Sequence, residues 1–193
     1  MEKTITPVEE VEEKYRHSGV VVYIFDQKGR ILVTRERHDK ETAFERGALR
    51  KPDQLGIYTE TREDGENWQT AFIRGVEEEF GLDKERCSQL FRLDPDNSYL
   101  GEALFREGVL ATVIQIKCVD TKRFLKEVEP KEELDVIGFL PVPFLRKAEK
   151  NIRYGVKRTL NELIGSNEFG KMAEEDVIPL NKDSLELLDI NNK

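Results

Sequence analysis

The chain of 193 residues is long enough for one domain with a hydrophobic core and too short for two ordinary domains. Hydrophobic residues make up 38% and charged residues 36%, which is typical of a folded protein with a highly charged surface and not of a disordered chain. The net charge of −8 argues against an extensive nucleic-acid surface, because such surfaces need clustered Lys and Arg.

Cysteine usage and hydropathy bear on the compartment. The chain has two cysteines, Cys87 and Cys118, and Cys118 lies within an apolar run, so we expect reduced thiols and no disulfide framework. Residues 1–16 are polar and acidic, and no stretch approaches the eighteen apolar residues of a membrane span. These features predict a cytoplasmic protein that does not engage a membrane.

The first half of the chain predicts a hairpin followed by a long loop. Residues 19–25 (GVVVYIF) and 30–34 (RILVT) have strand composition, and residues 26–29 between them are typical of a turn. Residues 36–54 are charged and aperiodic, so we expect a long loop. Residues 56–83 are predicted to form a loop and a helix.

The second half predicts further strands and a closing helix. The expected elements after the first helix, in chain order, are a loop, a weak strand at 89–93, strands at 99–105, 109–119 and 136–140, and a helix at 152–164 ended by Gly165. Strands combined with two helices indicate an α/β fold with a mixed sheet between helices. We expect an N-terminal arm at 1–17, a domain at 18–165 and a C-terminal tail at 166–193.

The central helix carries the most informative pattern. Asn67 is a suitable cap for a helix that runs to about Phe80, and Gly81 is a suitable stop. The residues predicted to face the sheet are Trp68, Phe72, Ile73, Val76 and Phe80. Glu78 and Glu79 fall on the flank of this apolar stripe, so two carboxylates meet at one edge of the core.

Two neighbouring carboxylates at a partly buried edge favour a cation, since like charges repel. A basic side chain would satisfy this need. A hard divalent ion, Mg²⁺ or Mn²⁺, is the alternative, because such ions take carboxylate oxygens and bridge to phosphate oxygens.

The sequence around this helix resembles the Nudix box, whose pattern is G-x5-E-x7-R-E-U-x-E-E-x-G-U with U an aliphatic residue. Seven of the nine specified positions match, with the spacing intact: Glu66, Arg74, Val76, Glu78, Glu79, Gly81 and Leu82. The resemblance covers residues 19–165 and implies a Nudix-like α/β/α sandwich with a mixed central sheet.

The resemblance also implies an activity, namely metal-dependent hydrolysis of a nucleoside diphosphate linked to another group. Glu78 and Glu79 would be catalytic residues that bind Mg²⁺ or Mn²⁺, and Glu66 would form a salt bridge with Arg74 that locks the loop onto the helix. Glu133 lies in the loop where many relatives carry an additional acidic ligand or base. The partner would be a small nucleotide-type substrate, and many relatives are homodimers.

Two positions depart from the pattern, and both bear on activity. Glu60 stands where the family has its first box glycine, and Gly75 stands where the family has the glutamate that joins the metal cluster or serves the attacking water. A glycine within a helix costs about 1 kcal/mol relative to alanine, so helix propensity does not explain Gly75.

Three interpretations of these departures remain open. The chain is a hydrolase whose missing carboxylate comes from Glu60 or Glu133, or it is a domain that binds a nucleotide and hydrolyses it poorly. In the third, Glu78 and Glu79 are surface charges paired with a basic side chain: Arg50, Lys51 or Arg62.

Substrate-binding candidates lie in and beside the long loop. Arg37 and Arg50 could clamp a diphosphate, because a guanidinium matches phosphate oxygens in bidentate fashion, although a solvated charged loop has the same composition. Tyr58 could stack on a base, and core packing is the alternative for this residue.

Overall fold

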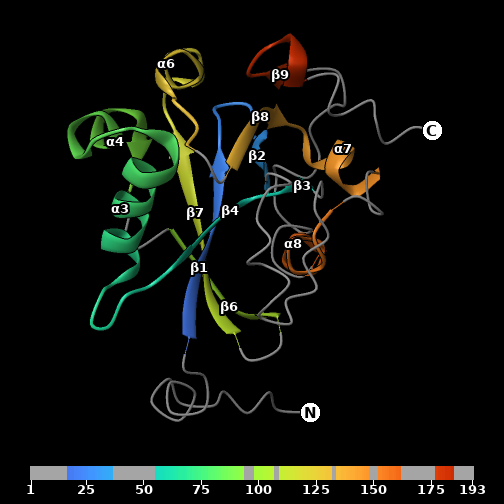
Figure 1. The fold of residues 1–193 in the computed structure, drawn as a ribbon. Coiled ribbons are helices and arrows are strands. Elements are labelled where there is room, and N and C mark those ends of the chain that lie inside the picture. Colours follow the sequence, from blue (N-terminus) through green and yellow to red (C-terminus); the bar gives the residue numbers. More distant parts are fainter. Residues whose placement is uncertain are drawn as a thin grey trace.

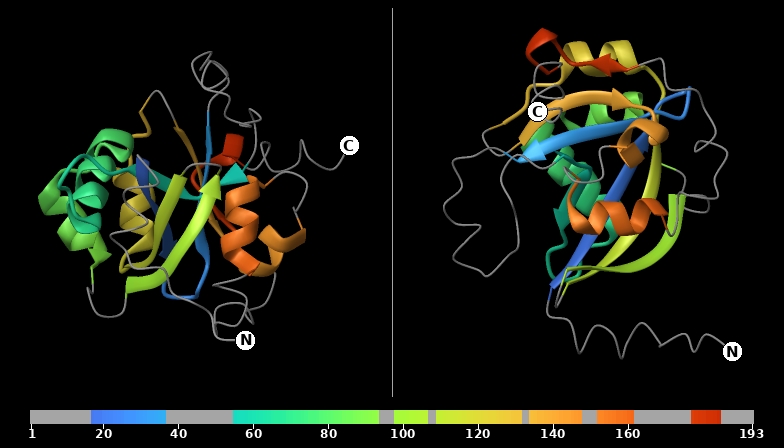
Figure 2. Two further views of the ribbon diagram at one scale, coloured as in Figure 1. Left: turned by 90° about the horizontal axis from the view of Figure 1, so that it is seen from below. Right: turned by 90° about the vertical axis from the view of Figure 1, so that its right-hand side faces the viewer.

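The structure is a computed structural model with three layers, a central sheet between two groups of helices (Figures 1 and 2). It describes residues 17–36, 55–93, 98–106, 109–131, 134–147, 152–161 and 177–184. The fold is the predicted α/β class, an α/β/α sandwich with a mixed central sheet.

The sheet is built from nine strands among the described residues. They are β1 (His17–Phe25), β2 (Ile31–Glu36), β3 (Leu55–Gly56), β4 (Tyr58–Thr61), β5 (Phe91–Arg92), β6 (Tyr99–Arg106), β7 (Val109–Cys118), β8 (Leu134–Leu140) and β9 (Ile178–Pro179). The main order is β5-β7-β1-β2-β8-β9, with β3 beside β2, β4 beside β1 and β6 beside β7. Strands β1 and β7 are parallel and the other pairs are antiparallel, so the sheet is mixed.

Strand β1 lies at the centre because it is apolar on both faces, as a strand covered by helices on both sides must be. Val20, Val22 and Ile24 pack into one core cluster, whereas Val21 and Tyr23 pack into the other. Alternate side chains of a strand point to opposite faces, so one short run of residues supplies both cores.

The helices divide between these two faces (Figure 1). They are α3 (Trp68–Phe80), α4 (Lys84–Leu90), α6 (Thr121–Glu127), α7 (Val142–Lys147) and α8 (Tyr154–Thr159). Buried residues of α3, α4 and α6 belong to the first cluster, and those of α7 and α8 belong to the second. The view from below shows the helices on opposite sides of the strands (Figure 2).

The predicted hairpin and long strands are confirmed, with ends that differ by a few residues. Strands β1 and β2 pair through Phe25 and Ile31, and the turn between them is closed by Asp26, whose Oδ1 accepts from the backbone N–H of Arg30 at 2.9 Å. Gly29 adopts φ 76°, a conformation that a glycine supplies at low cost. The short side chain of Asp26 therefore fixes the hairpin locally.

Two short helices were missed by the sequence-based predictions. The expected loop after Gly81 contains helix α4, because Asp83 accepts from the backbone N–H of Arg86 at 2.8 Å and caps it. Helix α6 was not anticipated, and Asp120 caps it in the same way. Both helices are seven residues long, too short for a clear apolar period.

The lead-in to the central helix was also predicted incorrectly. Residues 56–61 were expected to be loop, but all except Ile57 belong to β3 and β4, with β4 antiparallel to β1. These strands are two and four residues long, and pairing with the neighbouring strands stabilises them more than their own composition does. Helix α8 begins at Tyr154 and not at Ile152, which forms an isolated bridge with Leu55.

Several predictions lie outside the described residues. These are residues 1–16 of the expected arm, residues 37–54 of the long loop, and the expected tail apart from 177–184. Within that last segment, β9 pairs antiparallel with β8. None of the helices described is long and apolar enough to cross a membrane.

Candidate functional site

Helix α3 begins and ends where its sequence indicates. The side chain of Asn67 accepts from the backbone N–H of Thr70 at 2.9 Å, and Gly81 ends the helix in the left-handed conformation at φ 67°. Phe72, Val76 and Phe80 are buried against the sheet. This packing fixes the rotation of the helix and therefore the direction of its carboxylates.

Arg74 holds the preceding loop against α3 through Glu66. Its Nε donates to Glu66 Oε1 at 3.1 Å and its Nη2 donates to Glu66 Oε2 at 3.0 Å. Nη2 also donates to the backbone carbonyl of Thr61 at 2.8 Å. The chain before Asn67 thus folds back over the helix, and one guanidinium joins the end of β4, the loop and the helix.

Further carboxylates surround the same guanidinium. Nη1 of Arg74 donates to Glu78 Oε2 at 3.0 Å and lies 3.5 Å from Glu60 Oε1, while Nε lies 4.0 Å from Glu63 Oε1. We call Glu60, Glu63, Glu66 and Glu78 the acidic cluster. The cluster places four carboxylates around one guanidinium, and the charge of Arg62 also acts on Glu66. Carboxylates this close together favour nearby cations, because like charges repel.

The two carboxylates predicted to bind metal have different surroundings. Glu78 is 57% exposed, so its side chain can change partner with little loss of packing. Glu79 is half-buried, with its Oε2 atom buried. Glu79 lies one helical turn after Gly75, which faces Tyr58 and Glu60 of β4, and the charge of Glu79 contributes to raising the pKa of the Tyr58 hydroxyl.

Strand β4 directs a second pair of polar groups at this helix. Tyr58 and Glu60 are two residues apart and therefore share a face, and they pair with Val22 and Val20 of β1, which belong to the cluster beneath α3. The Tyr58 hydroxyl donates to Glu60 Oε2 at 3.1 Å. The Glu60 side chain is only 14% exposed and thus lies between the strand and the helix.

Gly75 is the helical residue opposite this pair. A β-carbon at position 75 would lie 2.9 Å from the carboxyl carbon of Glu60 and closer still to Glu60 Oε2 and the Tyr58 hydroxyl. Any other residue there would displace the Tyr58–Glu60 pair. The two sequence departures, at 60 and 75, are therefore in direct contact.

The surroundings raise the pKa of Glu60 and Tyr58 and lower the pKa of Glu66. Burial raises the pKa of Glu60, and hydrogen bonds from the Thr61 N–H and the Tyr58 hydroxyl oppose that rise. Burial, followed by the charge of Glu60, raises the pKa of the Tyr58 hydroxyl, so it remains a donor. Hydrogen bonds from Arg74 lower the pKa of Glu66, which stays ionised well into the acid range.

Tyr58 does not contact solvent, which corrects the suggestion that it stacks on a substrate base. It is 1% exposed, and its ring packs at 6.1 Å from that of Phe72 and 5.1 Å from that of Phe80. The core-packing alternative is the one observed. Arg37, Arg50 and Glu133 lie outside the described residues, as does Lys51.

Comparison with known proteins identifies the family. The sequence model described as the NUDIX domain matches residues 15–163, which is more than half of the chain. The chain belongs to the Nudix domain family. None of the curated proteins compared with it shows a significant match.

Solved structures show the same fold. A crystal structure of a protein from Deinococcus radiodurans has 13% sequence identity and a TM-score of 0.55, and the match covers 84% of this chain and 90% of that one. A Nudix hydrolase from Nitrosomonas europaea has 17% identity and a TM-score of 0.52, covering 83% of this chain and 93% of that one. These likenesses establish the Nudix architecture.

Nudix proteins generally use divalent metal ions, and the donor types here suit such an ion. Glu60, Glu78 and Glu79 offer carboxylate oxygens, the ligands that Mg²⁺ and Mn²⁺ prefer. Within the described residues, no three His, Cys, Asp or Glu side chains are close enough to form a ready-made metal cage. The donors are of the right kind, and assembling them requires the exposed Glu78 side chain to turn away from Arg74.

Sequence reasoning missed two participants in this site. It did not anticipate that Tyr58 would hold Glu60, nor that the Thr61 carbonyl would accept from Arg74. A signal for the first was available, because residues 58 and 60 share a face if the segment is a strand, but the segment was predicted as a loop.

Proposed function

We propose that this chain is a divalent-metal-dependent pyrophosphohydrolase that cleaves a nucleoside diphosphate linked to another group. The observation that carries the proposal is the edge of α3, where Glu78 and Glu79 lie beside a loop clamped by Arg74 and Glu66. The Nudix family membership supports hydrolysis of a phosphoanhydride bond.

Each residue of the edge has a separate part in this proposal. Glu78 and Glu79 would hold Mg²⁺ or Mn²⁺, which when bound neutralises phosphate charge and stabilises the charge that develops during displacement. Arg74 and Glu66 position the loop and helix, and neither has to touch the substrate. Glu133 remains a proposed additional base.

The chemistry is a displacement at phosphorus by water. The water oxygen forms the new bond to phosphorus, the bond from phosphorus to the bridging oxygen breaks, and the bridging oxygen leaves with the second phosphate. A carboxylate of the site accepts the proton of the water, so the products are a nucleoside monophosphate and the phosphate of the linked group.

The acidic cluster also shapes the substrate requirement. Arg74 is already engaged by carboxylates, so it is not available to neutralise a diphosphate. The phosphate charge would be balanced by metal and by basic side chains such as Arg37 and Arg50. We therefore expect no turnover without a divalent ion.

The test is product release from a panel of nucleotides that contain a pyrophosphate bond, with and without Mg²⁺ or Mn²⁺. We expect metal-dependent release that Glu79→Gln abolishes. Glu77→Gln is the matched control, because Glu77 lies on the same helix with an exposed side chain. If the unmodified protein binds a nucleotide but releases no product, the proposed hydrolase activity is contradicted.

A second candidate function is nucleotide binding without efficient hydrolysis. The pairing of Glu78 with Arg74 and the glycine at position 75 favour it, because both reduce the carboxylates immediately available to a metal. It predicts that a nucleotide binds in the absence of metal as tightly as in its presence. We further propose a cytoplasmic location. We also propose a homodimer, and sedimentation velocity of the full chain tests this oligomeric state.

A further inference from the structure

The starting point is that the two departures from the box are opposite in kind. Relative to the family pattern, position 60 has gained a carboxylate and position 75 has lost one. The residues are fifteen positions apart, and strand β4 and helix α3 bring them together.

The contact between them is specific to a glycine and a glutamate. The Glu60 carboxylate and the Tyr58 hydroxyl fill the place that a side chain at position 75 would need. A glutamate at position 75 would collide with both groups, so this chain could not add the helical carboxylate and keep the one on the strand in its present place. Glu60 in its present place therefore requires a glycine at position 75.

The Glu60 carboxylate is held in a defined position. Its Oε1 accepts from the backbone N–H of Thr61 at 2.8 Å, and its Oε2 accepts from the Tyr58 hydroxyl at 3.1 Å. Arg74 Nη1, which also binds Glu78, lies 3.5 Å from Oε1. A carboxylate has about four acceptor sites, so these contacts orient it and leave capacity for a cation.

The surroundings of Glu60 do not explain it as a packing residue. Apolar side chains dominate the cluster in which its neighbour Tyr58 lies, and a carboxylate that is only 14% exposed costs solvation energy. Arg74, which lies 3.5 Å from the Glu60 carboxylate, also binds Glu66 and Glu78. A metal ion at the same edge would offset the lost solvation of the Glu60 carboxylate.

We infer that Glu60 replaces the missing helical carboxylate, so that β4 and α3 together, instead of α3 alone, supply the carboxylates that bind the divalent ion. This inference rests on the proposed function. It assigns Tyr58 as the positioning residue, since its hydroxyl fixes the carboxylate above Gly75. It also means that Gly75→Glu alone is not a clean test of a missing carboxylate, because the new side chain would displace Glu60.

The experiment measures Mn²⁺ affinity by electron paramagnetic resonance of the free ion, which needs no substrate. The variants are Glu60→Gln, Glu79→Gln and the control Glu77→Gln. A triple variant, Tyr58→Phe with Glu60→Gly and Gly75→Glu, returns the carboxylate to the helix and removes the colliding groups. Circular dichroism during thermal unfolding establishes that each variant is folded.

We expect Glu60→Gln to weaken Mn²⁺ binding by about tenfold or more, the loss typical of disturbing a metal site. Glu77→Gln should bind as the unmodified protein does, and the triple variant should recover most of the loss. If the triple variant does not fold, the comparison of Glu60→Gln with Glu77→Gln decides the question.

Two contrary outcomes distinguish a failure of this inference from a failure of the proposed metal-dependent hydrolase. If Glu60→Gln binds Mn²⁺ as Glu77→Gln does while Glu79→Gln fails to bind, Glu60 is not a ligand and the metal-dependent hydrolase stands. If the unmodified protein does not bind Mn²⁺, both the inference and the proposed function are overturned.

Discussion

Arg74 and Glu66 are eight residues apart and pair through two hydrogen bonds, of 3.1 and 3.0 Å, that close the loop onto α3. Residues eight apart along one helix lie too far from each other for such a pair. The contact exists because the chain before Asn67 turns back, and Arg74 also reaches the Thr61 carbonyl there.

This geometry predicts that Arg74→Lys destabilises the fold although the charge is retained. A lysine cannot form the bidentate contact, and loss of charged hydrogen bonds should reduce the free energy of unfolding by about 1–3 kcal/mol. Urea unfolding measures the change. Arg92→Lys is the control, because the Arg92 side chain is exposed on β5, and an equal effect in both variants would refute the clamp.

Gly75→Ala should destabilise the protein, contrary to helix propensity. Alanine would ordinarily add about 1 kcal/mol of stability within a helix. Here its β-carbon meets the Tyr58 hydroxyl and the Glu60 carboxylate, so we expect a net loss of about 1–3 kcal/mol, as for overpacking. Thermal unfolding tests this, and combining Gly75→Ala with Glu60→Gly should restore part of the loss. If Gly75→Ala alone is more stable than the unmodified protein, the Tyr58 and Glu60 side chains move aside at little cost.

The Glu66–Arg74 pair also gives a pH dependence with a defined sign. Hydrogen bonds from Arg74 lower the pKa of Glu66 from its ordinary value of 4.5 in the folded state. The stabilisation is therefore complete above 4.5 and is lost as the pH falls through the lowered pKa of the folded state. The difference in unfolding free energy between the protein and Glu66→Gln should be constant near neutrality and shrink in acid. A difference that grows in acid would contradict the assignment.

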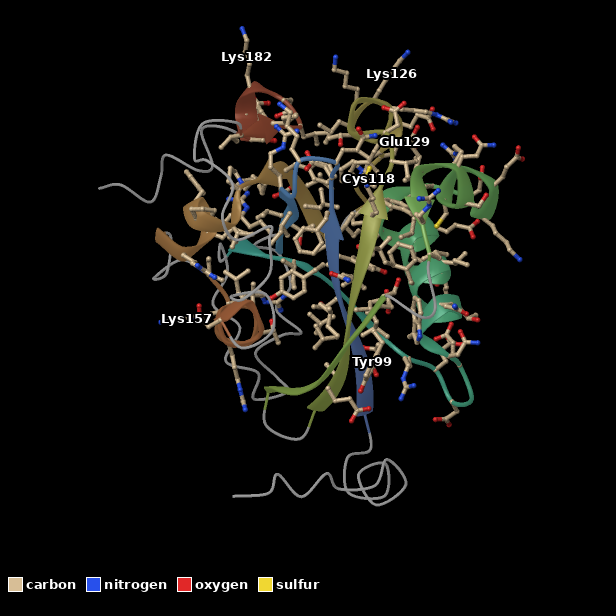
Figure 3. All side chains as sticks on the ribbon, turned by 180° about the vertical axis from the view of Figure 1, so that it is seen from behind. Tyr99, Cys118, Lys126, Glu129, Lys157 and Lys182 are labelled. Carbon is tan, nitrogen blue, oxygen red and sulfur yellow. The ribbon has the colours of Figure 1, made fainter. Side chains whose placement is uncertain are left out.

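The two thiols should be unreactive in the folded protein. Burial raises the pKa of Cys87 and of Cys118 to about 12, and both are at most 1% exposed. Cys118 lies at the end of β7 (Figure 3). Because the thiolate is the reactive form, iodoacetamide at pH 8 should label the native protein far more slowly than the urea-unfolded chain. Equal rates of labelling would mean that the core opens readily.

Long elements with a strong pattern could be predicted from the sequence, and short ones could not. The apolar run of β1 and the capped stripe of α3 contain enough information locally, and both were predicted. Helices α4 and α6 depend on single capping aspartates and on packing, and β4 depends on pairing with β1. For elements of this length, tertiary contacts decide the conformation.

The site shows the same division. The spacing of the box was enough to suggest Glu66, Arg74, Glu78 and Glu79, because these four residues lie within one loop and one helix. The contact between Glu60 and Gly75 needed the path of β4, which places residue 60 over the helix. In the sequence, Gly75 looks like the loss of a carboxylate. In the structure, the absence of a side chain at position 75 leaves room for the Tyr58 hydroxyl and the Glu60 carboxylate.

The most direct test of the central claim is a crystal structure of the protein grown with Mn²⁺. We predict an ion at the edge of α3, with oxygens of Glu78, Glu79 and Glu60 at about 2.0–2.4 Å, the range for hard cations and carboxylates. Glu78 would have left Arg74, and Arg74 would still hold Glu66. An ion bound elsewhere, or no ion with Glu78 still paired to Arg74 at saturating Mn²⁺, would contradict a metal-dependent site on this helix.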